Sequence, residues 1–415
     1  MIDIKIFGKS IYDPNREMED AAVCIGPGCI HCLNCLFRPI MKLAKWFGVS
    51  GAIHEIDSKP GTRYNEKFER IYERTVMVIL WIAFIEWFYR MMNLPPELSG
   101  EESWLQSYTI VSQSYLHAAL STTVFNLVGP RVKLLTPYRA FWDITRLSKF
   151  GVENPQRTEK KIARYEKITC YFVFPFVIVG VMITESYIYY MRTLRFYPDS
   201  IWHIFLCVLM IIALYFAYTS WLSSAIFFIV ICKGLSRRYE EITNQLHYLY
   251  ELQRANKPAD STFEPMQVKH FIGCRMVKVI NKFCQWYIFT TYLILIPGSC
   301  ISLYQFTSPE QSTDSRVLLG IHTVLLVMTL LLTSLNAAGV SSAAHRPYEI
   351  LHGLSLPELP LHERVKITLF LERLNGPTIG VTCLDFFVIT KGVVLSVFSA
   401  IVTYFLIFLQ FRSTT

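Results

Sequence analysis

The stretch that decides the fold class is residues 201–231, IWHIFLCVLMIIALYFAYTSWLSSAIFFIVI, which contains no Asp, Glu, Lys or Arg. It is longer than the about 20 apolar residues that an α-helix needs to cross the hydrocarbon core of a bilayer. After Lys233, the sequence Arg237-Arg238-Tyr239-Glu240-Glu241 continues the helical pattern with charged residues. We therefore expect a membrane-spanning helix that projects beyond the bilayer into the cytoplasm.

Six other stretches have comparable length and apolar character. They are Thr75–Met92, Trp104–Val128, Thr169–Met191, Val279–Tyr304, Val317–Val340 and Phe386–Phe411. The whole chain of 415 residues is 52% hydrophobic, which is too apolar for a soluble globule. The sequence therefore predicts an all-α, polytopic membrane protein with about seven transmembrane helices.

The charges of the connecting loops predict the orientation. Asn93–Ser103 contains acids and no base, and Thr193–Ser200 has only Arg195, whereas Arg131–Lys167 and Lys233–Lys278 are rich in bases. Because basic loops stay in the cytoplasm, we expect an intracellular N-terminus and an extracellular C-terminus. The net charge of +8 then reflects topology and not nucleic-acid binding. The outer loops are short, so a small ligand has to enter among the helices.

The end of the last span carries the most specific pattern in the chain. It reads Thr403-Tyr404-Phe405-Leu406-Ile407-Phe408-Leu409-Gln410-Phe411, which resembles the insect gustatory receptor signature of Thr-Tyr, five apolar residues and Gln-Phe. The preceding segment, Phe386 to Val394, is also similar to the final segment of that family. Weaker similarities lie at Pro39–Gly48 and at Arg238–Leu246.

The resemblance implies a ligand-gated, non-selective cation channel in the cell membrane of a sensory neuron, opened by a small organic tastant. It implies a homotetramer, or a heterotetramer with related receptors, in which the last helix of each subunit lines a central pore. The sugar-receptor branch typically has Glu after Thr-Tyr, and this chain has Phe405. The departure argues against a sugar receptor of that branch.

The candidate pore and gate residues all belong to the last span: Gln410, Phe411, Leu406, Ile407, Thr403 and Tyr404. An amide near the end of an apolar helix avoids lipid tails, and four copies would form a polar ring around ions. Phe411 and Leu406 could close such a path by dewetting. The alternative is an interfacial Gln410 that makes helix contacts, with Thr403 and Tyr404 serving packing or coupling.

Glu185 is the main candidate ligand-binding residue, because an acid in the outer part of a span is costly unless it faces water or a partner. Polar and aromatic residues at similar predicted depth are Tyr189, Trp202, His203, Tyr108, Gln113, Tyr115, Tyr304 and His322. Together they predict a pocket for a small polar organic ligand among spans two to six. The alternative is an aromatic belt at the membrane interface.

Four cysteines, Cys24, Cys29, Cys32 and Cys35, surround His31 in a spacing similar to an iron-sulfur or zinc motif. Because they precede the basic segment Leu36–Val49 in the reducing cytoplasm, free or lipidated thiols are favoured over a metal site, and disulfides are not expected. No cofactor is expected. The chain contains no His-Glu-x-x-His, Gly-x-Ser-x-Gly or Walker pattern, so an enzyme is not expected either.

The expected organisation has four parts: a cytoplasmic segment (1–74), six helices forming the ligand-binding bundle (75–340), a cytoplasmic anchor (341–385) and the pore helix with a short outer tail (386–415). A G-protein-coupled receptor would have the reverse orientation and an Asn-Pro-x-x-Tyr element in its last helix. A secondary transporter would show repeats or broken helices. A light or peroxide sensor related to the gustatory receptors stays open.

Overall fold

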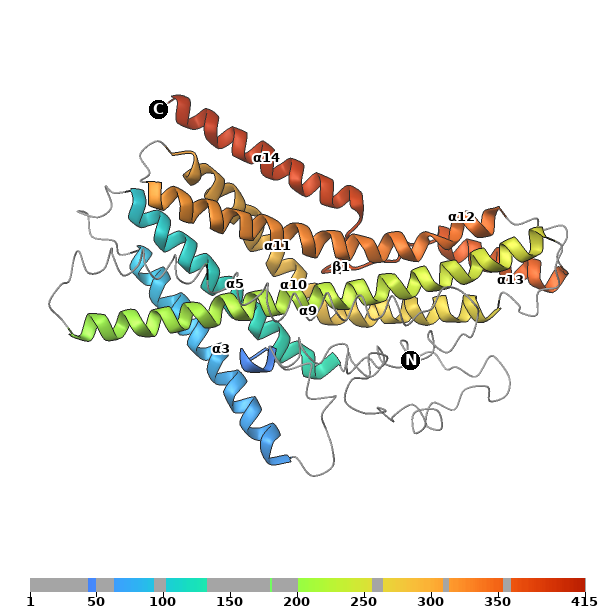
Figure 1. Cartoon of the computed structure of the whole chain (residues 1–415), viewed down its shortest axis with the longest axis horizontal. Coiled ribbons are helices and arrows are strands. Elements are labelled where there is room, and N and C mark those ends of the chain that lie inside the picture. The colour runs from blue at the N-terminus through green and yellow to red at the C-terminus, as the bar shows by residue number, and fades with distance from the viewer. Residues whose placement is uncertain are drawn as a thin grey trace.

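The computed structural model describes residues 44–49, 63–92, 102–132, 180, 201–255, 264–308, 313–353 and 360–414, and these residues are mostly helical (Figure 1). The main elements are α3 (Arg63–Met92), α5 (Glu102–Val132), α9 (Ile201–Arg254), α10 (Glu264–Phe306), α11 (Thr313–His345), α12 (Pro347–His352), α13 (Leu361–Asn375), β1 (Thr382–Cys383), β2 (Phe387–Val388) and α14 (Lys391–Thr414). The expectation of an all-α membrane fold is confirmed, apart from the two-residue strands of one hairpin.

In the described ranges, four helices are long and apolar enough to cross a membrane: α9, α10, α11 and α14. The predicted spans Thr75–Met92 and Trp104–Val128 lie within α3 and α5, which have 30 and 31 residues but are not among those four. The predicted span Thr169–Met191 lies outside the described residues, apart from helical Gly180. The count of about seven spans therefore stays a prediction.

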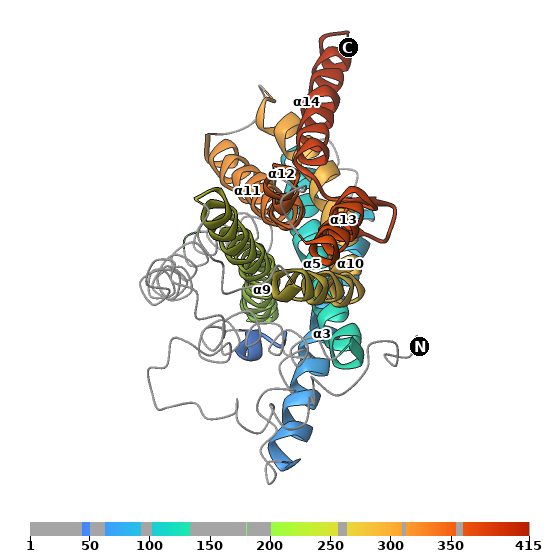
Figure 2. The same ribbon diagram turned by 90° about the vertical axis from the view of Figure 1, so that its right-hand side faces the viewer.

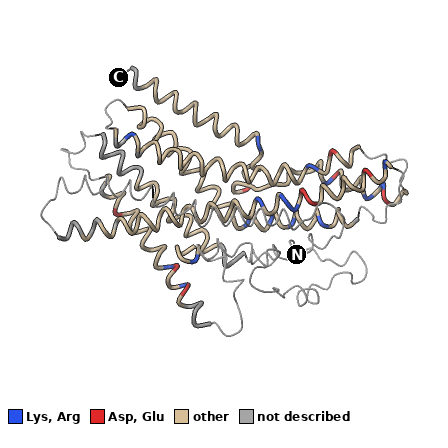
Figure 3. Tube along the Cα trace, in the orientation of Figure 1, with Lys and Arg blue, Asp and Glu red and all other residues tan. Residues whose placement is uncertain are grey.

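Charged residues divide the bundle into two ends. In Figure 3, Lys, Arg, Asp and Glu gather on the right-hand half of α9, α10 and α13, whereas the left-hand half of α9, α10 and α11 is almost free of them. On α9 the first Lys or Arg is Lys233, and on α10 the last is Lys282. We call the half of the bundle that contains α9 from Lys233 onward, α10 up to Lys282 and α13 the charged end. The other half is the apolar end.

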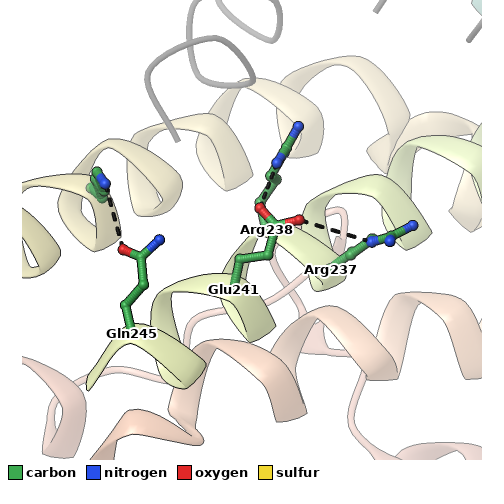
Figure 4. Close-up of polar contacts among 5 residues, drawn as sticks. Arg237, Arg238, Glu241 and Gln245 are labelled. Carbon is green, nitrogen blue, oxygen red and sulfur yellow. Dashed lines mark hydrogen bonds and ion pairs between the residues drawn. The ribbon is translucent and has the colours of Figure 1, made fainter. Parts of the chain in front are cut away.

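Helix α9 runs without interruption from the apolar end to Arg254, as its charged continuation after Lys233 predicts. Polar contacts join successive turns at the charged end (Figure 4). Glu241 accepts a hydrogen bond from the buried Arg238 and lies 3.9 Å from Arg237 Nε. Gln245 Oε1 accepts a hydrogen bond of 3.5 Å from Lys269 Nζ of α10, so this polar row also links two helices.

Aromatic rings fill the core where α5, α9 and α10 meet. The ring of Phe125 packs edge-on against Phe227, Phe283 and Tyr287, with centroid distances of 5.6, 5.3 and 5.4 Å. All four side chains are almost fully buried. Edge-to-face aromatic pairs add to the burial of apolar surface and stabilise specific helix contacts.

The short segment 44–49 lies against three helices. Tyr72 of α3 donates a hydrogen bond to Trp46 O, Asn126 of α5 donates to Gly48 O, and Ser220 of α9 donates to Phe47 O. Gly48 has φ 72°, and a Cβ atom there would lie 2.8 Å from Val76 Cβ. The glycine is therefore required both by the turn and by the close approach to α3.

The hairpin before α14 is held by one side chain of α10. Asn281 Nδ2 donates to Gly380 O, and Asn281 Oδ1 accepts from Thr382 N, both at 3.1 Å. Strands β1 and β2 pair Thr382 with Val388 and Cys383 with Phe387, so Phe386 lies in the turn. Helix α14 begins at Lys391, which is five residues later than the predicted start at Phe386, because the hairpin intervenes.

The buried His270 and the half-buried His345 join α10, α11 and the segment after α13. His345 Nδ1 lies 3.1 Å from Leu374 O, and His345 Nε2 accepts a hydrogen bond of 3.0 Å from Ile379 N. Only the neutral imidazole can donate at Nδ1 and accept at Nε2. His270 Nε2 lies 2.9 Å from Ala344 O, beside His345 in sequence. Burial lowers the pKa of His270 to about 4 and also lowers the pKa of His345.

We expect Asn281→Ala to lower the free energy of unfolding by about 1 to 3 kcal/mol, because Gly380 O and Thr382 N lose their partners. The measurement is thermal unfolding of the purified full chain in detergent. Asn336→Ala is the control, since Asn336 only donates to Leu332 O of its own helix. Equal melting temperatures for the two variants would contradict the role given to Asn281.

We also expect the charged end to lose stability on acidification. Below pH 6.5 the unfolded chain binds protons at His270 and His345, which the folded state does not bind until the pH falls through its lower pKa values. The loss should therefore develop between pH 6.5 and about 4. His345→Gln, whose amide can donate and accept, should reduce this dependence in thermal unfolding, and His362→Gln at an exposed position should not.

Candidate functional site

Within the described part of the chain, helix α14 packs on the bundle through one face. Val394 and Ile401 are buried, and Val397 and Phe398 pack against the core. The ring of Phe408 lies 5.8 Å from Tyr304 of α10. At about 100° per residue these five positions lie within roughly 100° of arc on the helix. Only 11% of the most apolar segment of α14 is buried, so the rest of its surface is exposed in the single subunit.

The opposite face of α14 carries its polar side chains. Ser396, Ser399, Thr403 and Gln410 are exposed and, at about 100° per residue, fall within an arc of roughly 60° that points away from the bundle. Ser396 Oγ donates to Gly392 O and Thr403 Oγ1 donates to Ser399 O, so both hydroxyl oxygens keep lone pairs directed outward. We call these four residues the polar face. In Figure 2, α14 stands at the upper edge of the molecule, with the C-terminus at its tip.

The predicted pore and gate residues lie at different positions around α14. Ile407 lies on the polar face with Thr403 and Gln410, whereas Phe411 and Tyr404 lie roughly 80 to 100° around the helix from Thr403. Leu406 lies on the other side of the polar face, roughly 60° from Thr403. All six are exposed in the single subunit.

A buried polar chain crosses three helices at the apolar end. Ser114 Oγ of α5 donates to Tyr218 OH of α9 at 3.1 Å, and Tyr218 OH lies 3.3 Å from His322 Nδ1 of α11. The three side chains are at most 2% exposed. We call them the interhelical triad. Each member comes from a different helix, so the hydrogen bonds of the triad depend on the relative positions of α5, α9 and α11.

A second polar layer adjoins the triad on α5 and α9. His117 Nε2 lies 3.3 Å from Thr291 Oγ1 of α10, and its ring packs edge-on against Trp221 at 5.1 Å between centroids. His117 Nδ1, Trp221 Nε1 and His322 Nε2 are buried without a hydrogen-bond partner among the described residues. Buried polar atoms of this kind are costly, and a small polar molecule could satisfy them.

Gln113 connects α5 to α10. Its Nε2 donates to Ile294 O at 3.0 Å, and a Cβ atom on Gly298 would lie only 1.5 Å from that nitrogen. The glycine therefore makes room for the amide. Pro297, inside α10, lacks the N–H that would otherwise bond to Leu293 O. The pairing of Gln113 with α10 thus occurs beside a turn of that helix that lacks one backbone hydrogen bond.

The structure brings together only part of the predicted pocket. Tyr115 and His322 lie in the buried core and Gln113 is half-buried, whereas Tyr304 contacts Phe408 of α14. Tyr108, Trp202 and His203 belong to α5 and α9, but their side chains are not described, and Glu185 and Tyr189 lie outside the described residues. Five residues of these layers were not predicted from the sequence: Ser114, His117, Tyr218, Trp221 and Thr291. The polar run Tyr218-Thr219-Ser220-Trp221 within an apolar span could have indicated two of them.

No group of His, Cys, Asp or Glu that could hold a metal ion occurs among the residues that the structure covers. The cysteine cluster, Cys24, Cys29, Cys32 and Cys35 with His31, lies outside them. Cys232, Cys274, Cys284, Cys300 and Cys383 are buried free thiols, which suits a role as small packing residues.

Proteins of known structure share this architecture. Two solved structures of the insect olfactory receptor OR5 from Machilis hrabei are similar in fold. The complex with eugenol has a TM-score of 0.67 and 15% sequence identity, and the match covers 92% of this chain and 99% of that chain. The structure described without eugenol has a TM-score of 0.67 and 16% identity, with 90% and 97% covered. No curated protein sequence matched.

A family model adds evidence from sequence. The model described as 7tm Chemosensory receptor matches residues 37–415, which includes the final-span pattern and nearly the whole chain. The matched range includes the four membrane-length helices, the charged extension of α9 and the C-terminal helix α14. This multi-pass membrane protein therefore belongs to the 7tm chemosensory receptor family, which is not a family of enzymes.

Proposed function

We propose that the protein is a gustatory-type receptor that acts as a ligand-gated, non-selective cation channel, with α14 of each of four subunits lining the pore. The polar face of α14 is the observation that supports this proposal most directly. The four residues of this face point away from their own subunit, although α14 is apolar enough to cross a membrane: Ser396, Ser399, Thr403 and Gln410. In lipid, the outward lone pairs of the Ser396 and Thr403 hydroxyls would find no hydrogen-bond donor.

Symmetric assembly resolves the position of these polar groups. When copies of α14 surround an axis, their polar faces meet water on the inside, and the packing faces of Val394 and Ile401 keep their contacts with the bundle. Rings of hydroxyl and amide oxygens replace part of the hydration shell of a cation without a fixed negative charge. Such rings support conduction with weak selectivity among cations.

We propose that the ligand is a small polar organic molecule held near the interhelical triad. His117 Nδ1, Trp221 Nε1 and His322 Nε2 offer it hydrogen-bonding atoms, and the surrounding aromatic rings offer apolar contact. The similar fold of a receptor solved with eugenol supports a small organic ligand, although that receptor is olfactory. The polar lining favours a more polar compound, in keeping with taste.

Helix α10 connects the proposed pocket to the proposed pore. Near the pocket, Thr291 contacts His117 and Ile294 O accepts from Gln113. One to three turns further on, Cys300 Sγ donates to Ile401 O and Tyr304 packs on Phe408, both in α14. A shift of α10 on ligand binding would therefore move the pore helix directly.

We expect Gln410→Ala to change the single-channel conductance and the relative cation permeabilities of ligand-evoked current, because one polar ring is lost. Gln410→Glu should raise the permeability of divalent cations by adding negative charge. The measurement is patch-clamp recording from cells that express this chain alone, with a panel of sugars, amino acids and bitter compounds. Val402→Ala, an exposed change off the polar face, is the control. Unchanged permeation in both Gln410 variants would refute the pore assignment.

We expect Tyr218→Phe to shift the half-maximal ligand concentration by about 3- to 10-fold, because one buried hydroxyl that bonds Ser114 and His322 is removed. Conductance should stay unchanged. The matched control is Tyr292→Phe, which removes a hydroxyl that bonds Ser334 elsewhere between α10 and α11. If both variants shift potency equally, the triad has no special part in ligand binding. For the predicted residue Glu185, Glu185→Gln tests the same proposal independently.

A further inference from the structure

One exposed face of α10 combines basic and aromatic side chains at the boundary between the two ends. Arg275, Lys278 and Lys282 are exposed, and at about 100° per residue they lie within roughly 60° of one another. Trp286 and Phe271 share this face and are 47% and 48% exposed. We call these five residues the α10 stripe. The guanidinium carbon of Arg275 lies 4.7 Å from the centre of the Phe271 ring, which orients the charged group along the helix.

The stripe crosses the surface of the bilayer. From Phe283 to Phe306, α10 has no charged residue, so the hydrocarbon core begins directly after Lys282. Trp286 lies one turn inside, at the depth that exposed tryptophans favour in the interface. At about 1.5 Å per residue, Lys278 and Arg275 lie about 6 and 10 Å beyond Lys282 on the aqueous side.

The bases of this face form no ion pair within the part of the chain that the structure describes. No carboxylate among the described residues lies within ion-pair distance of Arg275, Lys278 or Lys282. On α10 the acid nearest in sequence is Glu264, about 16 Å along the helix from Arg275. Other helices meet the boundary with bases too, at Lys233 of α9 and Lys391 of α14. Clusters of bases next to a membrane helix attract anionic lipids.

We propose that the α10 stripe binds a polyphosphorylated phospholipid of the cytoplasmic leaflet. The bridging phosphate of any phospholipid lies at the depth of Lys282 and leaves Lys278 and Arg275 unused. A headgroup with further phosphates that projects roughly 10 Å into water engages all three bases, and its acyl chains contact Trp286. The stripe thus selects the headgroup by its reach as well as by its charge.

Lipid binding here bears on the segment that leads into the pore helix. Asn281, between Lys278 and Lys282, holds Gly380 O and Thr382 N of the hairpin before α14. A headgroup on Lys278 and Lys282 fixes this turn of α10 and thereby stabilises the hairpin contact. The binding itself does not depend on the proposed conduction, so it is measured without current.

The test uses purified full-length protein in detergent and fluorescent dioctanoyl phosphatidylinositol 4,5-bisphosphate, with binding followed by anisotropy. We expect this lipid to bind at least tenfold more tightly than dioctanoyl phosphatidylserine. Lys278→Gln combined with Lys282→Gln should weaken binding about 30-fold, on the order of fivefold for each lysine. Arg254→Gln combined with Arg346→Gln removes the same charge from exposed positions off the stripe and should change affinity less than twofold.

Soluble inositol 1,4,5-trisphosphate separates a lipid site from a site for free phosphates. It should compete at least tenfold more weakly than the lipid, because it lacks the chains that contact Trp286, and Trp286→Ala should weaken only the lipid. Equal affinity for the soluble headgroup overturns the lipid assignment. Equal affinity for phosphatidylserine overturns the selection by headgroup, and unchanged binding in the double lysine variant, with its normal melting temperature, overturns the site.

Discussion

The architecture depends on the rule that a polar group inside a membrane needs a partner other than lipid. Where helices pack on one another, the rule is met by contacts such as those of the interhelical triad and of Gln113 with Ile294 O. On α14 the polar face is exposed in the single subunit and lies opposite the face that packs on the described helices. The same constraint thus accounts for the buried hydrogen bonds between helices. At the polar face of α14 it supports the proposed assembly of several subunits.

Helix α10 links the proposed pocket, the proposed pore and the hairpin before α14. It meets α5 at the proposed pocket, α14 at the proposed pore, and the hairpin through Asn281. The turn at Pro297 and Gly298, where the proline removes one backbone hydrogen bond, lies between the first two contacts. A helix that carries all these contacts can transmit a small displacement, because packed interfaces shift between discrete arrangements and do not deform continuously.

Much of the fold could be predicted because apolar length is a local property of sequence. The continuation of α9 beyond Lys233 and helices over the apolar stretches of α10 and α11 were predicted, although α10 begins at Glu264, before the predicted Val279. The start of the last helix was predicted at Phe386 and is observed at Lys391, since the paired residues 382–388 form a hairpin. Apolar side chains suit either conformation there, and only the contact with Asn281 of a distant helix distinguishes them.

The sequence by itself determined the membrane class, the charged extension and, through the pattern ending in Gln410-Phe411, the family. These follow from composition and from short-range order, which the chain carries without folding. Tertiary structure decided which face of α14 is covered, and that Ser114, Tyr218 and His322 meet although they lie far apart in sequence. The physical reason is that helix rotation and interhelical contacts depend on packing among all the helices at once, which no local pattern records.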